Sequence, residues 1–227
     1  PILTMRVIAE ERKQKTDQLL YSLPITTTDV VIGKYLALLV VYLIPLCIVS
    51  VYPSIFARYG EVYLPTSYGS IAAFFIMGAA LIAVGIFISS LTENQGFAAG
   101  IAIPVILLNY YSVSLAEHVS ATAFGSAAAL CVFCALLGLV IRILTKDKKM
   151  AFAVAVVLAA AVWAAYILNS EAFEGLLPNI MKKISLFERF YTFVSGVFDL
   201  TAIIYYITVI VFFLFLSVQS LEKRRYN

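Results

Sequence analysis

The sequence predicts an all-α membrane protein whose chain crosses the bilayer several times. Its 227 residues are 63% hydrophobic and only 13% charged, and their mean hydropathy is +0.98, whereas about a quarter of the residues of a soluble domain are charged. The apolar residues gather in runs of about 20, the length at which a helix spans a bilayer. The short alternating segments that a transmembrane barrel needs do not occur in the sequence.

Six of these apolar runs are long enough to be transmembrane helices. They contain no acidic residue, and Arg142, near the end of the fourth run, is their only basic residue. Because hydrocarbon offers no partner for backbone N–H and C=O groups, runs of this length must be helical. The six predicted spans are residues 35–56, 67–90, 96–116, 121–144, 150–168 and 201–221.

A charged segment, residues 1–34, precedes the first span. Glu11 and Lys15 are four residues apart with the acid first, a spacing that stabilises a helix. We expect one helix over about residues 4–23, with Thr28 as the N-cap of the next helix. The charged front and leucine-rich end of the helix over residues 4–23 suit a position at the membrane surface or against a soluble partner. A solvated linker that only enforces topology is the alternative.

The distribution of basic residues predicts which side of the membrane each connecting segment faces, because short cytoplasmic segments carry an excess of Lys and Arg. When six spans alternate the segments between two sides, one side holds 12 of the 16 basic residues and the other holds 4. The larger set lies in residues 1–34, in the loop near 142–149 and in the C-terminal tail. We therefore expect these segments to be cytoplasmic, and the net charge of +3 reflects orientation rather than nucleic-acid binding.

The predicted organisation has four parts: residues 1–34, five spans in 35–168, an outer segment 169–200, and the last span with a basic tail, 201–227. In the outer segment, residues at helical spacing form one apolar face: Ile180, Ile184, Phe187, Tyr191 and Val194. We expect an amphipathic helix on the outer leaflet that supports the outer mouth of the bundle. A gate for an amphiphilic substrate is the alternative.

The opening stretch, "PILTMRVIAEERKQKTDQLLYSLPITTTDVVIGKYLA", resembles the permease subunits of type-two ABC exporters, especially the branch related to gliding-motility permeases. Two later stretches, "SSLTENQ" (89–95) and residues 185–225, match as well, whereas the middle matches only as hydrophobic spans. The sequence departs from the family pattern at Lys15, where the family usually has Gly, and at Gln18, where it usually has Glu. The matching residues of the opening stretch are Thr4, Met5, Arg6, Ala9, Glu10, Glu11, Thr16, Leu19, Leu20, Pro24, Gly33 and Lys34.

The resemblance implies a coupling helix that docks into a groove on a cytoplasmic ABC ATPase subunit. It also implies a pump with two membrane halves, the second being a copy of this chain or a related permease, in a bacterial cell membrane. Spans 121–144 and 150–168 are then an extra pair. Because "PILTM" is typical of the end of an apolar span, we expect two further spans upstream, eight in all, and both chain ends in the cytoplasm. The implied coupling residues are Arg6, Glu10, Glu11, Arg12, Thr16, Leu19 and Leu20.

No residue of this chain is expected to be catalytic or to bind a metal or cofactor. A phosphate-binding loop needs Gly-x4-Gly-Lys-Ser/Thr, but around Gly33 and Lys34 the first glycine is missing and Tyr35 replaces the hydroxyl residue. ATP and Mg are therefore expected in the partner subunit. "EERKQK" is similar to the glutamate pair of intramembrane CAAX-type proteases, yet it lacks their arginine. The only histidine is His118, which we interpret as interfacial, and we interpret the C-x-x-C pair within the fourth span as packing residues.

Polar residues deep in the spans are few. Spans without deep ionisable residues argue against a secondary transporter. The polar cluster late in the third span is a candidate substrate path, with hydrogen bonding between helices as the alternative: it comprises Asn109, Tyr110, Ser112 and Ser114. Two pairs of small residues, Gly85 with Ser89 and Gly96 with Gly100, permit close backbone approach within the chain or across a dimer.

We interpret the sequence as the membrane permease subunit of an ATP-driven ABC transporter, an exporter by resemblance. An ATP-independent channel or secondary carrier is the first alternative, and an intramembrane enzyme with its catalytic set upstream is the second. A structural anchor is the third. The substrate is not specified by these residues.

Overall fold

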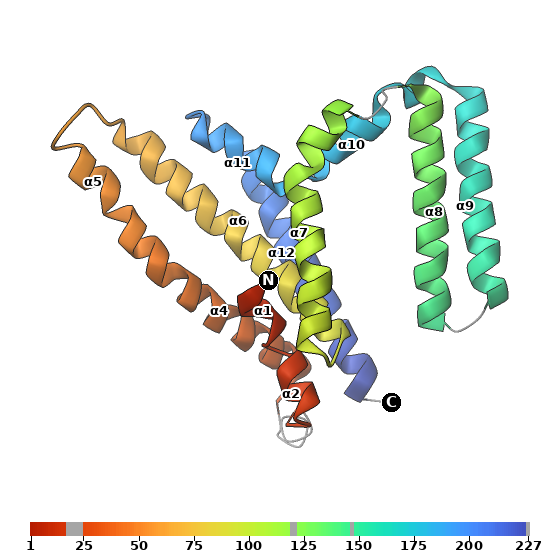
Figure 1. Cartoon of the computed structure of the whole chain (residues 1–227), viewed down its shortest axis with the longest axis horizontal. Helices are drawn as coiled ribbons and strands as arrows, with labels where there is room; N and C mark the ends of the chain where they lie inside the picture. The colour runs from red at the N-terminus through yellow and green to blue at the C-terminus, as the bar shows by residue number, and fades with distance from the viewer. Residues whose placement is uncertain (17–24, 119–121, 146–147, 226–227) are drawn as a thin grey trace. The chain divides into compact units, whose positions relative to one another are not determined.

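The computed structural model describes residues 1–16, 25–118, 122–145 and 148–225, and within them every regular element is a helix (Figure 1). The chain divides into two compact units. The first unit consists of residues 1–110 and 186–227, and the second of residues 111–185. Each unit is described separately below.

The first unit is built around a long central helix, α6. Inside it, α6 packs against the helices before it and after it in the chain, and its apolar span is by far the most buried of the candidate membrane spans. The helices of this unit are α1 (Ile2–Met5), α2 (Ala9–Lys13), α4 (Thr27–Ser50), α5 (Tyr52–Phe56), α6 (Leu64–Leu91), the first part of α7 (Gln95–His118), α11 (Leu186–Val194) and α12 (Leu200–Arg225).

Small residues allow the neighbouring helices to approach α6 closely. Gly78 leaves room for the ring of Tyr42 from α4, whose hydroxyl donates a 3.0 Å hydrogen bond to the carbonyl of Phe74. Further along, Ala79, Ile82, Ala83 and Ile86 form one core with Ile8, Val31, Tyr35, Leu38 and Leu221. In a bilayer such close packing, rather than hydrophobic burial, holds helices together.

Local capping bonds fix where the long helices begin. Thr26 and Asp29 form a reciprocal capping box at the start of α4, so the expected N-cap at Thr28 is wrong by two residues. Asn94 accepts hydrogen bonds from the backbone N–H groups of Gly96 (2.9 Å) and Phe97 (3.4 Å) at the start of α7. Such bonds satisfy donors that the first turn of a helix leaves without a partner.

The second unit contains a helical hairpin. Helices α8 (Ala123–Thr145) and α9 (Lys148–Leu168) pack side by side, and η1 (Glu171–Phe173) and α10 (Leu176–Ile184) pack near α8. An aromatic edge-to-face contact joins the two helices of the hairpin, between Trp163 of α9 and Phe124 of α8. Cys134, one of the two closely spaced cysteines, is buried in α8.

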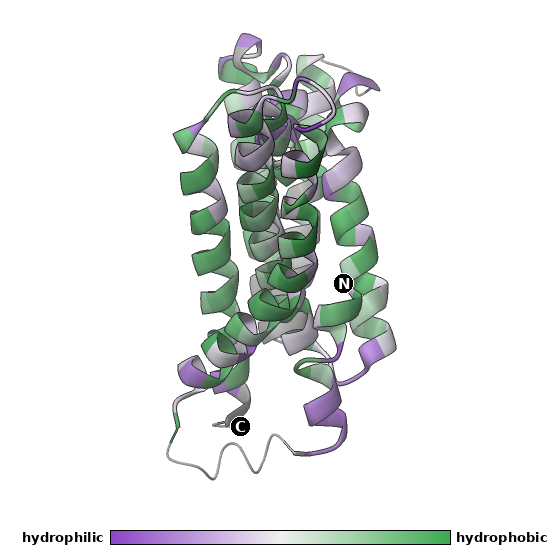
Figure 2. Ribbon diagram, turned by 90° about the vertical axis from the view of Figure 1, so that its left-hand side faces the viewer, coloured by the Kyte–Doolittle hydropathy of each residue, from purple (hydrophilic) through white to green (hydrophobic). Residues whose placement is uncertain are grey.

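Long apolar helices make this a multi-pass membrane protein. Within the described residues, four helices have the length and composition of a membrane span, at Thr27–Phe56, Leu64–Leu91, Gln95–His118 and Leu200–Lys223. Figure 2 shows hydrophobic residues along the bodies of the long helices and hydrophilic ones gathered near their ends. The described apolar parts of α8 and α9 are shorter, 123–132 and 152–168, so the count of six spans stays a prediction.

Two predicted helices are each divided in the structure. The expected continuous helix over residues 4–23 is wrong, because the chain turns at residues 6–8 between α1 and α2 and turns again at 14–16, and residues 17–24 lie outside the described part. The expected single outer helix is also wrong, because Ser185 has an extended conformation (ψ 122°) between α10 and α11. The break changes the register, and the buried residues of α11 are Leu186 and Phe193.

Candidate functional site

The charged N-terminal segment, residues 1–16, lies against the last turns of α6. Thr4 is only 2% exposed and packs on the bare backbone of Gly85. Ile8 and Ala9 are also buried, at 3% and 0% exposure. This region of α6, defined by Gly85, Ser89 and Ser90, is called the α6 contact site below.

Ser89 joins the break between α1 and α2 to α6. Its Oγ accepts hydrogen bonds from the backbone N–H groups of Ile8 (3.3 Å) and Ala9 (3.1 Å) and donates one to the carbonyl of Met5 (3.2 Å). A hydroxyl has one donor and two acceptor positions, so these three bonds use its full capacity. Since the ends of a helix leave backbone groups unsatisfied, Ser89 stabilises the turn that separates the two short helices.

Arg12 fixes the far end of α2 to the same site. Its side chain is 4% exposed, and its guanidinium donates to the backbone carbonyl of Ser90. The hydroxyl of Ser220, from α12, donates to the same carbonyl at 3.1 Å. A basic side chain commonly binds the last carbonyls of a helix, and here that carbonyl connects the N-terminal segment, α6 and α12.

An ion pair connects the segment to α4. Lys34 pairs with Glu11, and its ammonium also donates a 2.7 Å hydrogen bond to the carbonyl of Val7. The Lys34 side chain is 16% exposed and that of Glu11 is 36% exposed. Nearby, the hydroxyl of Thr27 at the start of α4 donates to the carboxylate of Glu222 in α12, at 3.0 Å.

A shallow groove of about 390 Å³ follows this ion pair on the surface. Arg6, Glu10, Glu11 and Lys34 supply its charged groups, and Val7, Ala37 and Leu38 supply apolar wall. Arg6 is exposed, and Glu10 accepts a long hydrogen bond, 3.4 Å, from Gln14. The arrangement offers both signs of charge around an apolar floor, which suits contact with a protein surface.

Residues 1–116 match the model of a family described as ABC-2 family transporter protein. The chain belongs to the ABC-2 transporter family. A search of curated proteins and a search of solved structures gave no significant match. The family match ends at residue 116, and the second unit begins at residue 111. The resemblance noted from the sequence is thus confirmed at the level of an ABC-2 permease, and the chain is a membrane permease of the ABC transporter class.

The three stretches given above for the resemblance meet at or beside the α6 contact site, and the family match covers the first two of them. The opening stretch supplies the N-terminal segment, and "SSLTENQ" supplies Ser89, Ser90 and the Asn94 cap of α7. The C-terminal stretch supplies Ser220 and Glu222. Segments about 80 and 130 residues apart in the sequence are therefore joined by hydrogen bonds in one place.

The five predicted coupling residues that the structure describes differ in how available they are to a partner of the permease. Arg12 is buried and Glu11 is paired with Lys34, whereas Arg6 and Thr16 are exposed and Glu10 is partly exposed. Leu19 and Leu20 lie outside the described residues. Contact of this set with an ATPase stays a prediction.

The predicted substrate-path residues divide between the two units. In the first unit, Asn109 Oδ1 accepts a 3.0 Å hydrogen bond from the backbone N–H of Leu186 at the start of α11, and the Tyr110 ring meets Phe187 edge-on at 5.1 Å. In the second unit, Ser112 is partly buried and Ser114 is exposed. The Asn109 bond joins α7 to α11. It is of the kind that the sequence analysis gave as the alternative to a substrate path, namely hydrogen bonding between helices. A role in a substrate path stays a prediction.

The structure decides how one pair of small residues is used. Gly85 and Ser89 hold the N-terminal segment of the same chain rather than a second copy. Ser90, Thr27 and Glu222 were not singled out from the sequence, and only the "SSL" ending of an apolar run could have drawn attention to the first. By contrast, a Cβ at Gly100 would meet nothing within 4 Å.

Lys15 has a backbone conformation that favours glycine. It is the only non-glycine residue of the described chain with a positive φ, 58°, at the position where the family resemblance usually has Gly. Left-handed backbone costs a residue with a Cβ about 1–2 kcal/mol. We expect Lys15→Gly to raise the Tm of the purified protein by about 2–4 °C, since about 1 kcal/mol moves the Tm of a chain this long by that amount.

The matched control is Lys13→Gly, two residues earlier, where the backbone is helical at the last residue of α2. There glycine costs about 0.5–1 kcal/mol, so Tm should fall. Thermal unfolding in detergent measures both variants. Equal effects of the two substitutions would contradict this account of Lys15.

Proposed function

We propose that this ABC-2 permease is the membrane subunit of an exporter and that its N-terminal segment transmits motion from a cytoplasmic ABC ATPase. The observation that carries the proposal is the attachment of that segment to two long helices, to α6 through Ser89 and Ser90 and to α4 through Lys34, while Ser220 of α12 bonds to the same Ser90 carbonyl as Arg12. A movement imposed on the segment therefore acts directly on α6 and α4, and on α12 through the Ser90 carbonyl.

The strength of this attachment supports the proposal. Neutral hydrogen bonds contribute a net stabilisation of about 0.5–1.5 kcal/mol each, and those that involve a charged group about 1.5–3 kcal/mol. Ser89 makes three neutral hydrogen bonds to the segment. Arg12 and Lys34 each add a hydrogen bond from a charged group. Their combined energy is large enough for the segment to pull on α6 before it detaches.

ATP and Mg belong to the partner in this proposal. The pump contains two ATPases and a second permease half, either a copy of this chain or a related permease of the gliding-motility branch, in a bacterial cell membrane. The groove lined by Arg6 and Glu10 is the surface that meets the ATPase, with Leu19 and Leu20 nearby in the sequence. Asn109, Tyr110, Ser112 and Ser114 contribute to the substrate path.

Copurification tests the proposal directly. We expect a soluble ATPase subunit to accompany the full-length permease when it is extracted from its own host in mild detergents, and the preparation to hydrolyse ATP. Mass spectrometry identifies the partner. Recovery of the permease alone in several detergents, together with transport in vesicles that lack any nucleotide-binding protein, would instead establish the ATP-independent carrier.

The proposed orientation places the N-terminal segment and the C-terminal tail in the cytoplasm. In a variant whose three native cysteines are replaced by serine, Lys183→Cys should react with a membrane-impermeant thiol reagent added outside cells, and Lys223→Cys should not. Both lysines are exposed in the structure. A difference in their labelling therefore reports the side of the membrane on which each lies. Permeabilised cells, in which both should react, are the control. The reverse pattern in intact cells would place the N-terminal segment on the wrong side for a cytoplasmic ATPase.

A further inference from the structure

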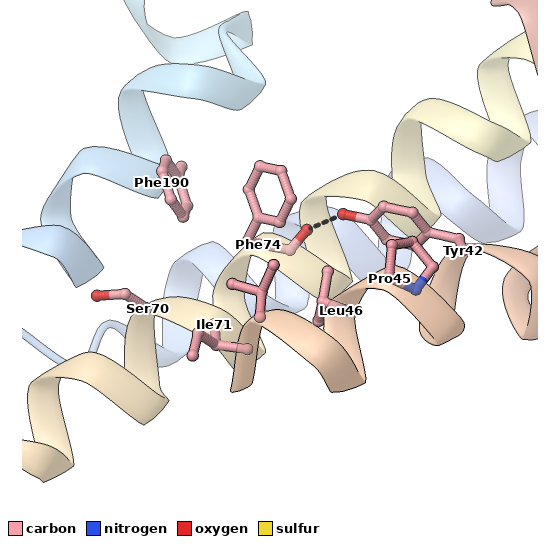
Figure 3. A pocket seen from close by; sticks show the side chains of 8 residues that line it. Tyr42, Pro45, Leu46, Ser70, Ile71, Phe74 and Phe190 are labelled. Carbon is pink, nitrogen blue, oxygen red and sulfur yellow. Dashed lines mark hydrogen bonds between the residues drawn. The ribbon is translucent and has the colours of Figure 1, made fainter. Parts of the chain in front are cut away.

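An apolar pocket lies between α4, α6 and α11 in the first unit (Figure 3). Pro45, Leu46 and Val49 line it from α4, Ile71 and Phe74 from α6, and Phe190 closes one side from α11. Its volume is about 290 Å³. The wall residues of α4 and α6 belong to helices that have the length and composition of membrane spans.

The pocket exists because α4 and α6 pack together only along part of their length. At one end Tyr42 closes the gap, by its bond to the Phe74 carbonyl and by stacking on the Phe75 ring at 5.9 Å. Beyond the end of α4, the hydroxyls of Ser54 in α5 and Tyr68 in α6 share a 2.6 Å hydrogen bond. Pro45 lies between these two contacts.

The third wall of the pocket is held firmly in place. Phe190 lies against Phe74 with ring centroids 5.7 Å apart. Its helix, α11, buries Leu186 and Phe193 in a core with α6 and α12, and the Tyr206 hydroxyl donates a 2.7 Å hydrogen bond to the Leu186 carbonyl. The pocket is therefore part of the packed structure.

The polar groups at the pocket are already bonded within the chain. Ser70 donates to the carbonyl of Thr66 at 2.8 Å and approaches that of Phe193 at 3.3 Å, and Tyr42 donates to that of Phe74. A cavity needs several available polar partners to hold water, and dry cavities bind apolar molecules. The occupant must therefore be apolar.

The depth of the pocket identifies the source of that occupant. Its residues in α6, Ser70 to Phe74, lie about 10–15 Å along the helix from its start, at 1.5 Å per residue, and so fall within one half of a hydrocarbon core about 30 Å thick. Val49 and Phe74, on its rim, are 49% and 43% exposed, and in a bilayer such surface faces acyl chains. Those chains are the apolar molecules present at this depth.

We propose that the pocket binds one acyl chain of a membrane phospholipid as a resident ligand. Its volume is roughly twice that of an engineered cavity that binds benzene, which leaves space for roughly a dozen carbon atoms. That is enough for much of one acyl chain and too little for a whole phospholipid or a helix of a second copy. The chain fills the gap that α4 and α6 leave open, and α11 covers it.

Lipid retention tests the site. The full-length protein is reconstituted in vesicles of phosphatidylethanolamine and phosphatidylglycerol, extracted, washed extensively in detergent, and weighed by native mass spectrometry. We expect one phospholipid per chain to remain. Val49→Trp places an indole at the rim and should lower retention about tenfold, since excluding about two methylene groups already costs that much affinity. Ile44→Trp, on the same helix at 60% exposure and outside the pocket lining, is the matched control and should retain the lipid.

A second variant works in the opposite direction, so misfolding cannot imitate the result. Phe74→Ala enlarges the pocket and keeps the backbone carbonyl that Tyr42 binds, and it should increase retention or admit a bulkier chain. A phospholipid with a photoreactive acyl chain should label Ile71 in the wild type and in Ile44→Trp, and not in Val49→Trp. Equal retention by Val49→Trp and Ile44→Trp, or a wild type that keeps no phospholipid, would overturn the proposal.

Discussion

Gly85→Ala is expected to detach the N-terminal segment from α6 and to lower transport at least about tenfold. A Cβ built on Gly85 would lie 2.7 Å from Thr4 Cβ and 2.8 Å from its Cγ2, and closer still to its hydroxyl. Thr4 is fully enclosed at 2% exposure, so α1 has to move away as a whole. Overpacking of this kind typically costs about 1–3 kcal/mol, and here the cost falls on the contact that is proposed to carry motion.

The control for this variant lies on the same helix. A Cβ at Gly69 in α6 would meet nothing within 4 Å, so Gly69→Ala should leave transport and Tm unchanged or slightly raise Tm through its helix propensity. Transport in vesicles, thermal unfolding and protease sensitivity of residues 1–16 report on activity, stability and detachment.

The double variant Gly85→Ala with Thr4→Gly removes the clashing side chain. It should recover part of the lost stability, and the double-mutant cycle measures the coupling of the two positions. Two outcomes would refute a role for the α6 contact site: full transport by Gly85→Ala, or identical behaviour of Gly85→Ala and Gly69→Ala.

The sequence predicted the membrane-spanning helices because their signal is local. Length and apolarity alone mark a run that must be helical in hydrocarbon, and the observed helices α4 with α5, α6, α7 and α12 cover the corresponding predicted spans. The Gly85 and Ser89 pair was also visible as small residues four apart. Its partner was not, because the bonds from Ile8 and Ala9 to Ser89 cross about 80 residues of chain, and no local pattern encodes such a distance.

The N-terminal helix was predicted too long for a related reason. The spacing of Glu11 and Lys15 favours a helix locally, by only about 0.2–0.5 kcal/mol. In the structure Glu11 pairs instead with Lys34. Ser89 accepts hydrogen bonds from Ile8 and Ala9, which offset the loss of helical hydrogen bonds at the break in residues 6–8. Tertiary contacts of a few kcal/mol outweigh the local preference.

The outer segment shows why periodicity alone failed there. Ile184, Tyr191 and Val194 were assigned to one apolar face, but they are 57%, 53% and 48% exposed, whereas Leu186 and Phe193 are buried. In a membrane protein the surface facing lipid is as apolar as the surface facing the core. Hydropathy therefore identifies an apolar residue without indicating which of the two surfaces it joins.

Reversing the charge of Glu11 is the second change for which we expect a large effect. Glu11→Lys places a second ammonium group beside Lys34, whose side chain is 16% exposed and is also held by the Val7 carbonyl. An exposed ion pair contributes under about 1 kcal/mol, but a like charge left in a partly desolvated position costs more, of the order of 2 kcal/mol after allowance for the exposure of Glu11. Both Tm and transport should fall.

Exchanging the two charges separates the internal role of Glu11 from any role in docking. The variant Glu11→Lys with Lys34→Glu restores opposite charges and should recover stability. The recovery should be incomplete, because a carboxylate at position 34 cannot donate the hydrogen bond that Lys34 gives to the Val7 carbonyl. Glu10→Lys reverses the neighbouring acid, which accepts only a long bond from Gln14 within the segment. Glu10→Lys should leave Tm unchanged and weaken association with the copurifying ATPase. Adding Lys34→Glu to this variant should not restore the association.

The comparison of these variants distinguishes the two acids by measurement. Unfolding in detergent reports on the internal ion pair, and the ATPase recovered with the permease reports on docking. If Glu11→Lys kept the wild-type Tm, the ion pair with Lys34 would contribute nothing to holding the segment. If Glu10→Lys and the Glu10, Glu11 double reversal both retained full ATPase association and transport, the segment would be a topological linker, because a surface that docks an ATPase cannot accept two reversed charges without loss of affinity.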